Sequence, residues 1–199
     1  MNIKPDAILF DLDGVLIDSV DAWLTSLNIA LGQFNHKIIK RDDFIENYWG
    51  HDLHDTLNLI GVDQRAVAVC NRLYEKNLNK VKLYQNVKST LQKLNSYKKG
   101  VITNTPKNHT KIILEKFNLN KYFDTFITSD DVNRGKPNPE IVFKTCKILN
   151  VEPEHVIIIG DTKSDIQAGK AAGCKVIGMN IKADYTIRKI SELTKILKL

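Results

Sequence analysis

Two aspartates, separated by a single residue, directly follow a short apolar run near the start of this chain. The run is AILF at residues 7–10, and DLDGV follows at residues 11–15. An apolar run that stops at a polar, glycine-containing segment is typical of a buried strand. Because side chains alternate along a strand, Asp11 and Asp13 point the same way. Two such carboxylates are unfavourable unless a cation or a shared proton relieves them, so the sequence predicts a charged site at the end of this strand.

Similar apolar runs recur later in the chain and alternate with helical patterns. The runs rich in Ile, Val and Phe cover residues 6–11, 99–104, 123–128, 155–161 and 175–179. Helical patterns lie between the later runs, near residues 107–118, 138–149 and 163–172. Strands that alternate with helices are typical of α/β proteins, so we expect a doubly wound parallel sheet. A final amphipathic helix is expected over residues 186–197.

The alternation is interrupted between about residues 18 and 82. Apolar residues there have helical spacing instead, as in Val20, Leu24, Leu27 and Leu31. We therefore expect an α-helical cap domain over residues 18–82, which covers the end of the first strand. The α/β core domain would comprise residues 1–17 and 83–199. The connections near residues 15–18 and 82–86 would act as hinges.

Length and composition are those of an ordinary globular protein. The chain has 199 residues, of which 43% are hydrophobic and 26% charged, enough for a substantial core. No apolar run approaches the length of a membrane span, and residues 1–6 lack the apolar region of a secretion signal. Cys70, Cys146 and Cys174 are far apart and form no C-x-x-C pair. We expect reduced, buried thiols in a cytoplasmic protein without a membrane partner.

The net charge of +6 is spread along the sequence. Lysines such as Lys107, Lys111 and Lys116 have the spacing of solvated helix faces, whereas nucleic-acid binders cluster their basic residues. We therefore expect no nucleic-acid partner, and a general attraction of small anionic substrates. The sequence leaves the oligomeric state open between a monomer and a homodimer.

Polar residues stand at the carboxyl ends of three of the expected strands. Asp11, Thr103 and Asp161 each close an apolar run. Ligands of open α/β sheets bind outside the carboxyl ends of the strands, so we expect these three segments to converge. Lys136 in the segment GKPNP, and Asp165 in GDTKSD, add two further charges. Together these residue types indicate a magnesium-assisted phosphoryl-transfer site.

Each feature has an ordinary alternative when it is taken alone. Thr103 could satisfy backbone groups at a strand end, and Lys136 could be a solvated surface lysine. Asp161 and Asp165 could be a turn acid and a helix-start acid favoured by the helix dipole. It is their joint occurrence at strand ends, in this order, that favours a catalytic site.

A calcium-binding loop that begins at Asp11 is excluded. Such a loop needs an oxygen ligand at its fifth position, glycine at its sixth and an acid at its twelfth. Those positions are Val15, Leu16 and Ala22.

The four segments resemble the four sequence motifs of the haloacid dehalogenase superfamily. The matching residues are Asp11-x-Asp13-Gly14-Val15, Thr103, Lys136 with Pro137-x-Pro139, and Gly160-Asp161-x-x-x-Asp165. The insert of residues 18–82 is similar to that superfamily's α-helical cap, which implies a Rossmann-like core. Residues 165–173 (DIQAGKAAG) resemble its phosphoglycolate-phosphatase-like branch. One departure is Thr105, where relatives in that branch often carry a lysine.

The resemblance implies a phosphatase that hydrolyses a small phosphate monoester through an aspartyl-phosphate intermediate. Asp11 would be the nucleophile, and Asp13 would protonate the leaving oxygen and then deprotonate the attacking water. Thr103 and Lys136 would bind the transferring phosphoryl oxygens. Relatives that displace a halide generally lack the second aspartate, so Asp13 favours phosphate esters.

The resemblance also implies that Mg²⁺ is the cofactor. Its ligands would be the carboxylate of Asp11, the backbone carbonyl of Asp13 and the carboxylate of Asp161, completed by phosphate and water. Asp165 would hold a metal-bound water.

The substrate, a small phosphorylated metabolite, is left open by the sequence. We expect Asn104 and His51 to contact it. His51 lies in the polar and aromatic segment 48–54 (YWGHDLH), directly before a helical pattern. The alternative for this segment is a helix start with surface histidines and a tryptophan packed in the cap.

Two other functions stay open. A sugar phosphomutase of the β-phosphoglucomutase type shares the same motifs. A non-enzymatic, phospho-accepting signalling domain also combines a doubly wound sheet with an acid cluster, a threonine and a lysine. Receiver domains of that kind are shorter, lack a helical insert and carry the phosphorylated aspartate on a later strand.

Overall fold

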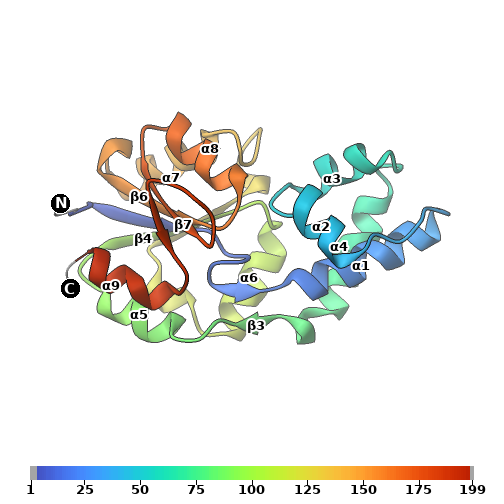
Figure 1. Ribbon diagram of the computed structural model, residues 1–199, viewed down its shortest axis with the longest axis horizontal. Helices are drawn as coiled ribbons and strands as arrows, with labels where there is room; N and C mark the ends of the chain where they lie inside the picture. Colours follow the sequence, from blue (N-terminus) through green and yellow to red (C-terminus); the bar gives the residue numbers. More distant parts are fainter. Residues whose placement is uncertain (1–3, 198–199) are drawn as a thin grey trace.

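The computed structural model describes residues 4–197, which form a sheet-containing part and a helical part (Figure 1). Six strands form one sheet in the order β5-β4-β1-β6-β7-β8, and every neighbouring pair is parallel. The strands are β1 (Ala7–Phe10), β4 (Lys98–Thr103), β5 (Thr125–Thr128), β6 (Val156–Gly160), β7 (Lys175–Met179) and β8 (Tyr185–Ile187). The expected α/β class with a parallel, doubly wound sheet is confirmed.

The register places β1 in the middle of the sheet. Phe10 pairs with Val101 of β4 on one side and with Ile159 of β6 on the other. The chain crosses to opposite sides of β1 to reach these two neighbours, which makes the end of β1 the switch point where such sheets bind ligands. The segments that follow β1, β4 and β6 therefore leave the sheet next to one another.

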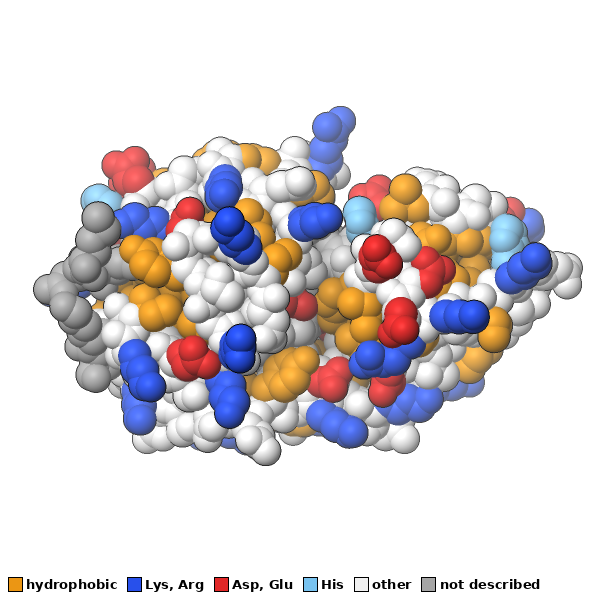
Figure 2. Space-filling model, in the orientation of Figure 1, with side chains coloured by type: hydrophobic (Ala, Val, Ile, Leu, Met, Phe, Trp, Pro, Cys, Tyr) orange, Lys and Arg blue, Asp and Glu red, His pale blue; other side chains and the backbone are white. Residues whose placement is uncertain are grey.

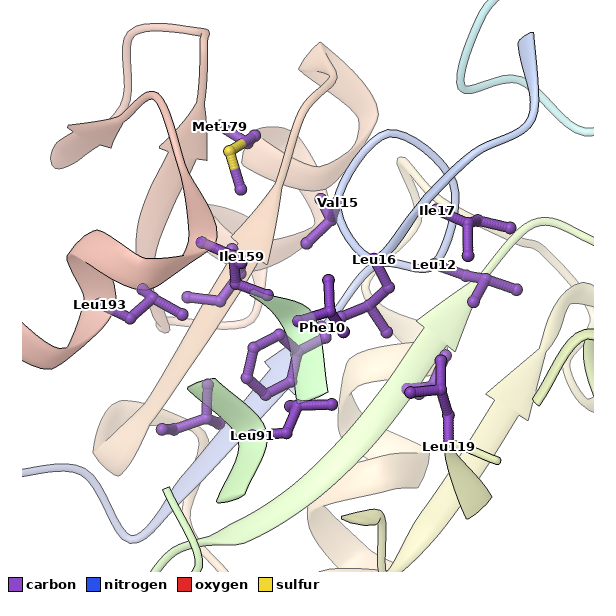
Figure 3. Packing of buried hydrophobic residues seen from close by; sticks show 14 of the residues in the cluster. Phe10, Leu12, Val15, Leu16, Ile17, Leu91, Leu119, Ile159, Met179 and Leu193 are labelled. Carbon is purple, nitrogen blue, oxygen red and sulfur yellow. The ribbon is translucent and has the colours of Figure 1, made fainter. Parts of the chain in front are cut away.

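Helices cover both faces of the sheet. One face packs against α5 (Val87–Lys93), α6 (Lys107–Lys116) and α9 (Leu193–Ile196), and the other against α7 (Glu140–Leu149) and α8 (Lys163–Ala171). Phe10 belongs to the first apolar cluster with Leu91 and Leu193 (Figure 3), whereas its neighbour Leu9 belongs to the second cluster. Burial on both faces explains why β1 is a continuous apolar run.

The helical part has an apolar core of its own. It contains α1 (Val20–Gln33), α2 (Arg41–Asn47), α3 (Leu53–Ile60) and α4 (Ala66–Lys76). Leu27, Leu31, Phe44 and Leu57 are buried in one cluster between these helices. The helical spacing in this stretch is therefore confirmed, whereas the domain boundaries at residues 17/18 and 82/83 stay a prediction.

Two short strands connect the helical part to the sheet. β2 (Ile17–Asp18) pairs antiparallel with β3 (Lys82–Leu83), so both expected hinge regions contain a strand. Short 3₁₀ helices complete the fold at η1 (Leu78–Lys80), η2 (Asn120–Tyr122), η3 (Ser129–Asp131), η4 (Pro153–His155) and η5 (Ile190–Glu192).

The expected helix over residues 186–197 is wrong. This segment forms β8, η5 and the single-turn helix α9, because Tyr185–Ile187 pairs with the free edge of β7. Its apolar residues all face the same cluster, so burial alone produces the spacing that indicated a helix. The helix expected from residue 138 begins at Glu140, with Pro139 as its N-cap.

The three cysteines are free and buried, as expected. Among residues 4–197, none of the helices combines the length and the apolar composition needed to cross a bilayer.

Candidate active site

A buried lysine lies between two carboxylates at the carboxyl end of the sheet. The Nζ atom of Lys136 is 2.8 Å from Oδ1 of Asp11 and 2.6 Å from Oδ1 of Asp165, and Lys136 is only 3% exposed. Nζ also donates to the backbone oxygen of Ile102 at 3.2 Å. Burial lowers the pKa of Lys136, but Asp11 and Asp165 outweigh it and hold the pKa above its usual value. The lysine therefore stays charged, and its burial contradicts the alternative of a solvated surface residue.

The start of α8 fixes the carboxylate of Asp165. The Thr162 backbone N–H and hydroxyl donate to Oδ2 of Asp165 at 3.0 and 2.7 Å, in a capping box. Gly160 allows this close approach, because a Cβ there would collide with the Asp165 side chain. Both carboxylate oxygens of Asp165 thus already have partners, Lys136 and Thr162.

The two carboxylate oxygens of Asp161 differ in their hydrogen bonding. Oδ2 accepts a hydrogen bond of 2.9 Å from the indole nitrogen of Trp49, a residue between α2 and α3. Oδ1 is buried and has no hydrogen-bond partner among residues 4–197. Gly14 lies against this carboxylate with φ +78°, and a Cβ at that position would collide with it. An unpaired buried oxygen is costly, which indicates that a further ligand belongs here.

The acid cluster fits a divalent cation. Oxygens of Asp11, Asp161 and Asp165 all lie within 4.8 Å of one another. Burial, and then the charge of Asp165, raises the pKa of Asp11 well above its usual value and that of Asp161 to about 7. Carboxylates that repel one another in this way are relieved by a cation, and an all-oxygen donor set suits a hard one. Asp11 and Asp161 are the better candidate ligands, because the oxygens of Asp165 are already engaged.

Asp13 is held by three hydroxyl groups. Thr105 donates to its Oδ2 at 2.7 Å, Thr103 donates to the same oxygen at 3.5 Å, and Ser19 donates to Oδ1. Hydrogen bonds on both oxygens fix the orientation of the carboxylate. Thr103 and Asp13 thus lie together where β4 and β1 end.

Asn104 connects three segments through its side-chain amide. Its Nδ2 donates to the backbone oxygens of Lys136 at 2.8 Å and Gly50 at 3.0 Å, and its Oδ1 accepts from the Lys136 N–H at 2.9 Å. These contacts position the loop that carries Lys136. Substrate binding by Asn104 stays a prediction.

A cavity of about 70 Å³ is lined by residues of the strand ends and of the helical part, and Figure 2 shows a groove between these two parts on one face of the molecule. Six of the predicted residues line it: Asp11, Asp13, His51, Thr103, Asn104 and Lys136. Asp161 lines a second cavity on the other side of Trp49. His51 has an exposed side chain and lies at the edge of both cavities. The roles assigned to these residues stay predictions, although the structure brings all of them to one end of the sheet.

Sequence reasoning missed Ser19, Thr105 and the contact of Trp49. Thr105 lies two positions after Thr103, a spacing that could have indicated a second hydroxyl near the same carboxylate. Ser19 directly precedes the first helical pattern, but nothing in the sequence pairs it with Asp13. For Trp49 the sequence leaves two interpretations, a polar and aromatic segment near the substrate or a tryptophan packed in the cap, and neither includes a contact with Asp161.

The comparisons with known proteins agree with this geometry. A family model for haloacid dehalogenase-like hydrolases matches residues 8–179. The chain belongs to this family. A pyrophosphatase PpaX of Bacillus mycoides (strain KBAB4) is 31% identical to it, and the alignment covers 98% of both chains.

Two solved structures are also similar to the chain. A predicted phosphoglycolate phosphatase from Haemophilus somnus 129pt is 25% identical with a TM-score of 0.82, covering 96% of this chain and 97% of that one. A HAD phosphatase from Thermococcus onnurineus is 29% identical with a TM-score of 0.71, covering 96% and 97%. The expected Rossmann-like fold and the expected enzyme class, a phosphatase of this family, are confirmed. The alternative of a non-enzymatic signalling domain is therefore set aside.

Proposed function

We propose that this enzyme is a Mg²⁺-dependent phosphatase that hydrolyses a small phosphate monoester through an aspartyl-phosphate on Asp11. One observation carries the proposal: the carboxylate of Asp11 contacts Lys136 and lines the same cavity as Asp13, an acid whose orientation is fixed by hydroxyl groups. A nucleophile, a cation for phosphoryl oxygens and a proton donor are thus present together.

In the first step an oxygen of Asp11 attacks phosphorus, and the bond from phosphorus to the ester oxygen breaks. The leaving oxygen takes a proton from Asp13. Lys136 and the hydroxyl of Thr103 bind phosphoryl oxygens and stabilise the charge that redistributes on them. The N–H of Leu12 donates to Oδ1 of Asp11 at 2.7 Å, which keeps the nucleophile oriented before the attack.

In the second step water attacks the phosphorus of the aspartyl-phosphate. Asp13, now ionised, accepts a proton from this water, and the carboxylate of Asp11 is released together with inorganic phosphate. Thr105, Thr103 and Ser19 keep Asp13 in place for both proton transfers.

The carboxylates of Asp11 and Asp161, with the backbone carbonyl of Asp13, would hold Mg²⁺. When bound, the ion offsets the negative charge of these acids and of the phosphate. Asp165 would orient Lys136 and a metal-bound water.

Residues 18–82 would act as a cap domain that closes over the site and excludes water. The contact of Trp49 with Asp161 and that of Gly50 with Asn104 support this proposal, because both join the helical part to the strand ends. His51 and Asn104 would contact the substrate from the two sides of the cavity. Phosphoglycolate, a monoester, and pyrophosphate, an anhydride, belong in the panel of compounds to be tested, because the similar proteins carry these names.

The test is phosphate release from p-nitrophenyl phosphate and from a panel of phosphorylated metabolites, with Mg²⁺ and without a bisphosphate activator. Wild-type enzyme should release phosphate, and acid-quenched protein should contain phosphorylated Asp11 by mass spectrometry. Asp11→Asn should retain the fold and lose turnover, whereas the exposed control Asp42→Asn should be unaffected. Turnover by Asp11→Asn at more than a few per cent of wild type would remove Asp11 from the mechanism. Activity that requires a sugar bisphosphate would instead support the mutase alternative.

A further inference from the structure

The cavity above Asp11 has two chemically different walls. The wall formed by the strand ends is polar and contains Asp11, Asp13, Thr103 and Lys136. The wall formed by the helical part is mainly aromatic and aliphatic, with Trp23, Leu27, Phe44, Tyr48, Trp49 and Leu53. A substrate that fills this space thus has its phosphoryl group on a polar surface and its remaining part on an apolar one.

The apolar wall has no cationic side chain that could pair with a second negative charge, as far as the described residues show. Among the described residues that line the cavity, Lys136 is the only lysine or arginine, and its ammonium already contacts Asp11 and Asp165. His51 lies at the exposed edge. A carboxylate or phosphate in the leaving group would therefore lie against apolar side chains without a cation, which is unfavourable.

The position of Asp13 places the leaving group in this cavity. Asp13 lines the apolar cavity, whereas the larger second cavity is lined by Gly14, Asp161, Thr162 and Lys163. The oxygen that takes a proton from Asp13 must lie within hydrogen-bond distance of it. The leaving group therefore enters the apolar cavity and lies away from Lys163.

We infer that the enzyme prefers phosphate monoesters of uncharged, apolar alcohols over esters and anhydrides whose leaving group is anionic. The inference rests on the proposed function and specifies its substrate class. Asp13 supplies the proton that makes the leaving group a neutral alcohol, and water then releases phosphate from Asp11. This preference is opposite to that of an enzyme specific for pyrophosphate or phosphoglycolate, because both of those substrates have an anionic leaving group.

A matched pair of substrates tests the inference. Isobutyl phosphate and phosphoglycolate have nearly the same shape, because two methyl groups in the first replace two carboxylate oxygens in the second. We expect kcat/KM for isobutyl phosphate to exceed that for phosphoglycolate by at least about tenfold, and pyrophosphate to be similarly poor. Equal values, or a preference for either anionic substrate, would overturn the inference. Absence of turnover with p-nitrophenyl phosphate would instead contradict the proposed function itself.

A charge introduced into the apolar wall provides the second test. Leu53→Lys, at the first position of α3, should shift the ratio of the two kcat/KM values toward phosphoglycolate by about tenfold, because it adds the missing cation. Leu59→Lys is the control on the same helix, at a position that is 60% exposed and outside the cavity. Equal ratios in both variants would show that the apolar wall does not select the leaving group. Melting temperatures of both variants check that each is folded.

Discussion

The indole nitrogen of Trp49 lies 2.9 Å from Oδ2 of Asp161 and donates a hydrogen bond to it. This contact joins the segment between α2 and α3 to the acid cluster at the end of β6. The neighbouring Gly50 accepts a hydrogen bond from Asn104, and a Cβ at Gly50 would collide with Thr162. The helical part thus contacts the residues that follow two different strands, at the place where the site is assembled.

Trp49→Phe should weaken Mg²⁺ binding while it keeps most of the apolar packing. The indole N–H holds Oδ2 of Asp161, so its loss frees the carboxylate to rotate. We expect the Mg²⁺ concentration for half-maximal activity to rise about tenfold, as is usual when a hydrogen-bond partner of a metal ligand is removed. Trp23→Phe is the control. It makes the same substitution at a tryptophan that stacks on Tyr74, with ring centroids 3.8 Å apart, instead of donating to Asp161. The same Mg²⁺ dependence in both variants would contradict the role of Trp49.

Removal of metal should abolish activity and change stability in the same protein. EDTA should silence the enzyme and Mg²⁺ should restore it, because the carboxylates repel one another without a cation. Ca²⁺ should inhibit the enzyme, since its higher coordination number and more flexible geometry do not hold the nucleophile and the phosphate in line. Mg²⁺ should also raise the melting temperature of wild type, and less so that of Asp161→Asn. Full activity in EDTA, with no metal in the purified protein, would disprove the metal site.

Asp13→Ala should impair poor leaving groups far more than good ones. p-Nitrophenolate leaves with little need for a proton, so slow phosphorylation of Asp11 by p-nitrophenyl phosphate should persist. An alkyl phosphate needs the proton from Asp13 and should lose about 10²–10⁴-fold in kcat. Both kcat values are measured on one preparation of the variant. Equal losses on the two substrates would mean that Asp13 is not the acid.

His51→Ala tests whether the segment before α3 contributes to recognition. If His51 contacts the part of the substrate distant from phosphorus, kcat/KM should fall for the best ester of the panel and hardly change for p-nitrophenyl phosphate. His54→Ala is a matched control, since His54 is exposed and its ring contacts Gln64 at 2.8 Å. Equal, small losses on every substrate would leave His51 without a role in recognition.

His109 should make stability fall in mild acid. It is 3% exposed and packs against Trp23 and Tyr74, and burial lowers its pKa although Glu75 opposes the shift. Below an unfolded-state pKa of about 6.5, the unfolded chain therefore binds a proton more readily than the folded one. The stability due to His109 is complete above that pH and is lost as the pH falls toward the folded-state pKa.

Urea unfolding at several pH values measures this effect. The free energy of unfolding of wild type, relative to His109→Gln, should decline between about pH 7 and pH 5. His36→Gln, at an exposed position, controls for the loss of a histidine as such. A constant difference between wild type and His109→Gln over this range would contradict the prediction.

The strands that carry the site could be predicted because both faces of the sheet are covered. Residues 7–10 are all buried, so their apolar run is unambiguous. The strands β2 and β3 could not be predicted in this way, since each has two residues and exists only through its pairing with the other. Residues 186 and 187 belong to β8 and not to the expected helix, because a strand and a helix bury the same apolar residues there.

The residues of the site likewise differ in whether the sequence predicts their contacts. Asp11, Lys136 and Asp165 stand in motifs at strand ends, and the parallel order of the sheet is sufficient to bring them together. The contacts of Trp49 and Ser19 depend on how the helical part lies against the sheet. No local pattern encodes that arrangement, because it results from packing between distant segments.

The central position of β1 has a consequence for synthesis on the ribosome. β1 is the first of the six strands to emerge, yet its two neighbours, β4 and β6, are translated much later. Until residues 156–160 have left the exit tunnel, the apolar strand that precedes Asp11 has at least one open edge, a hazard for pairing with other nascent chains. Chaperones that shield such edges would therefore matter most during the long interval before β6 appears, when no phosphatase site yet exists.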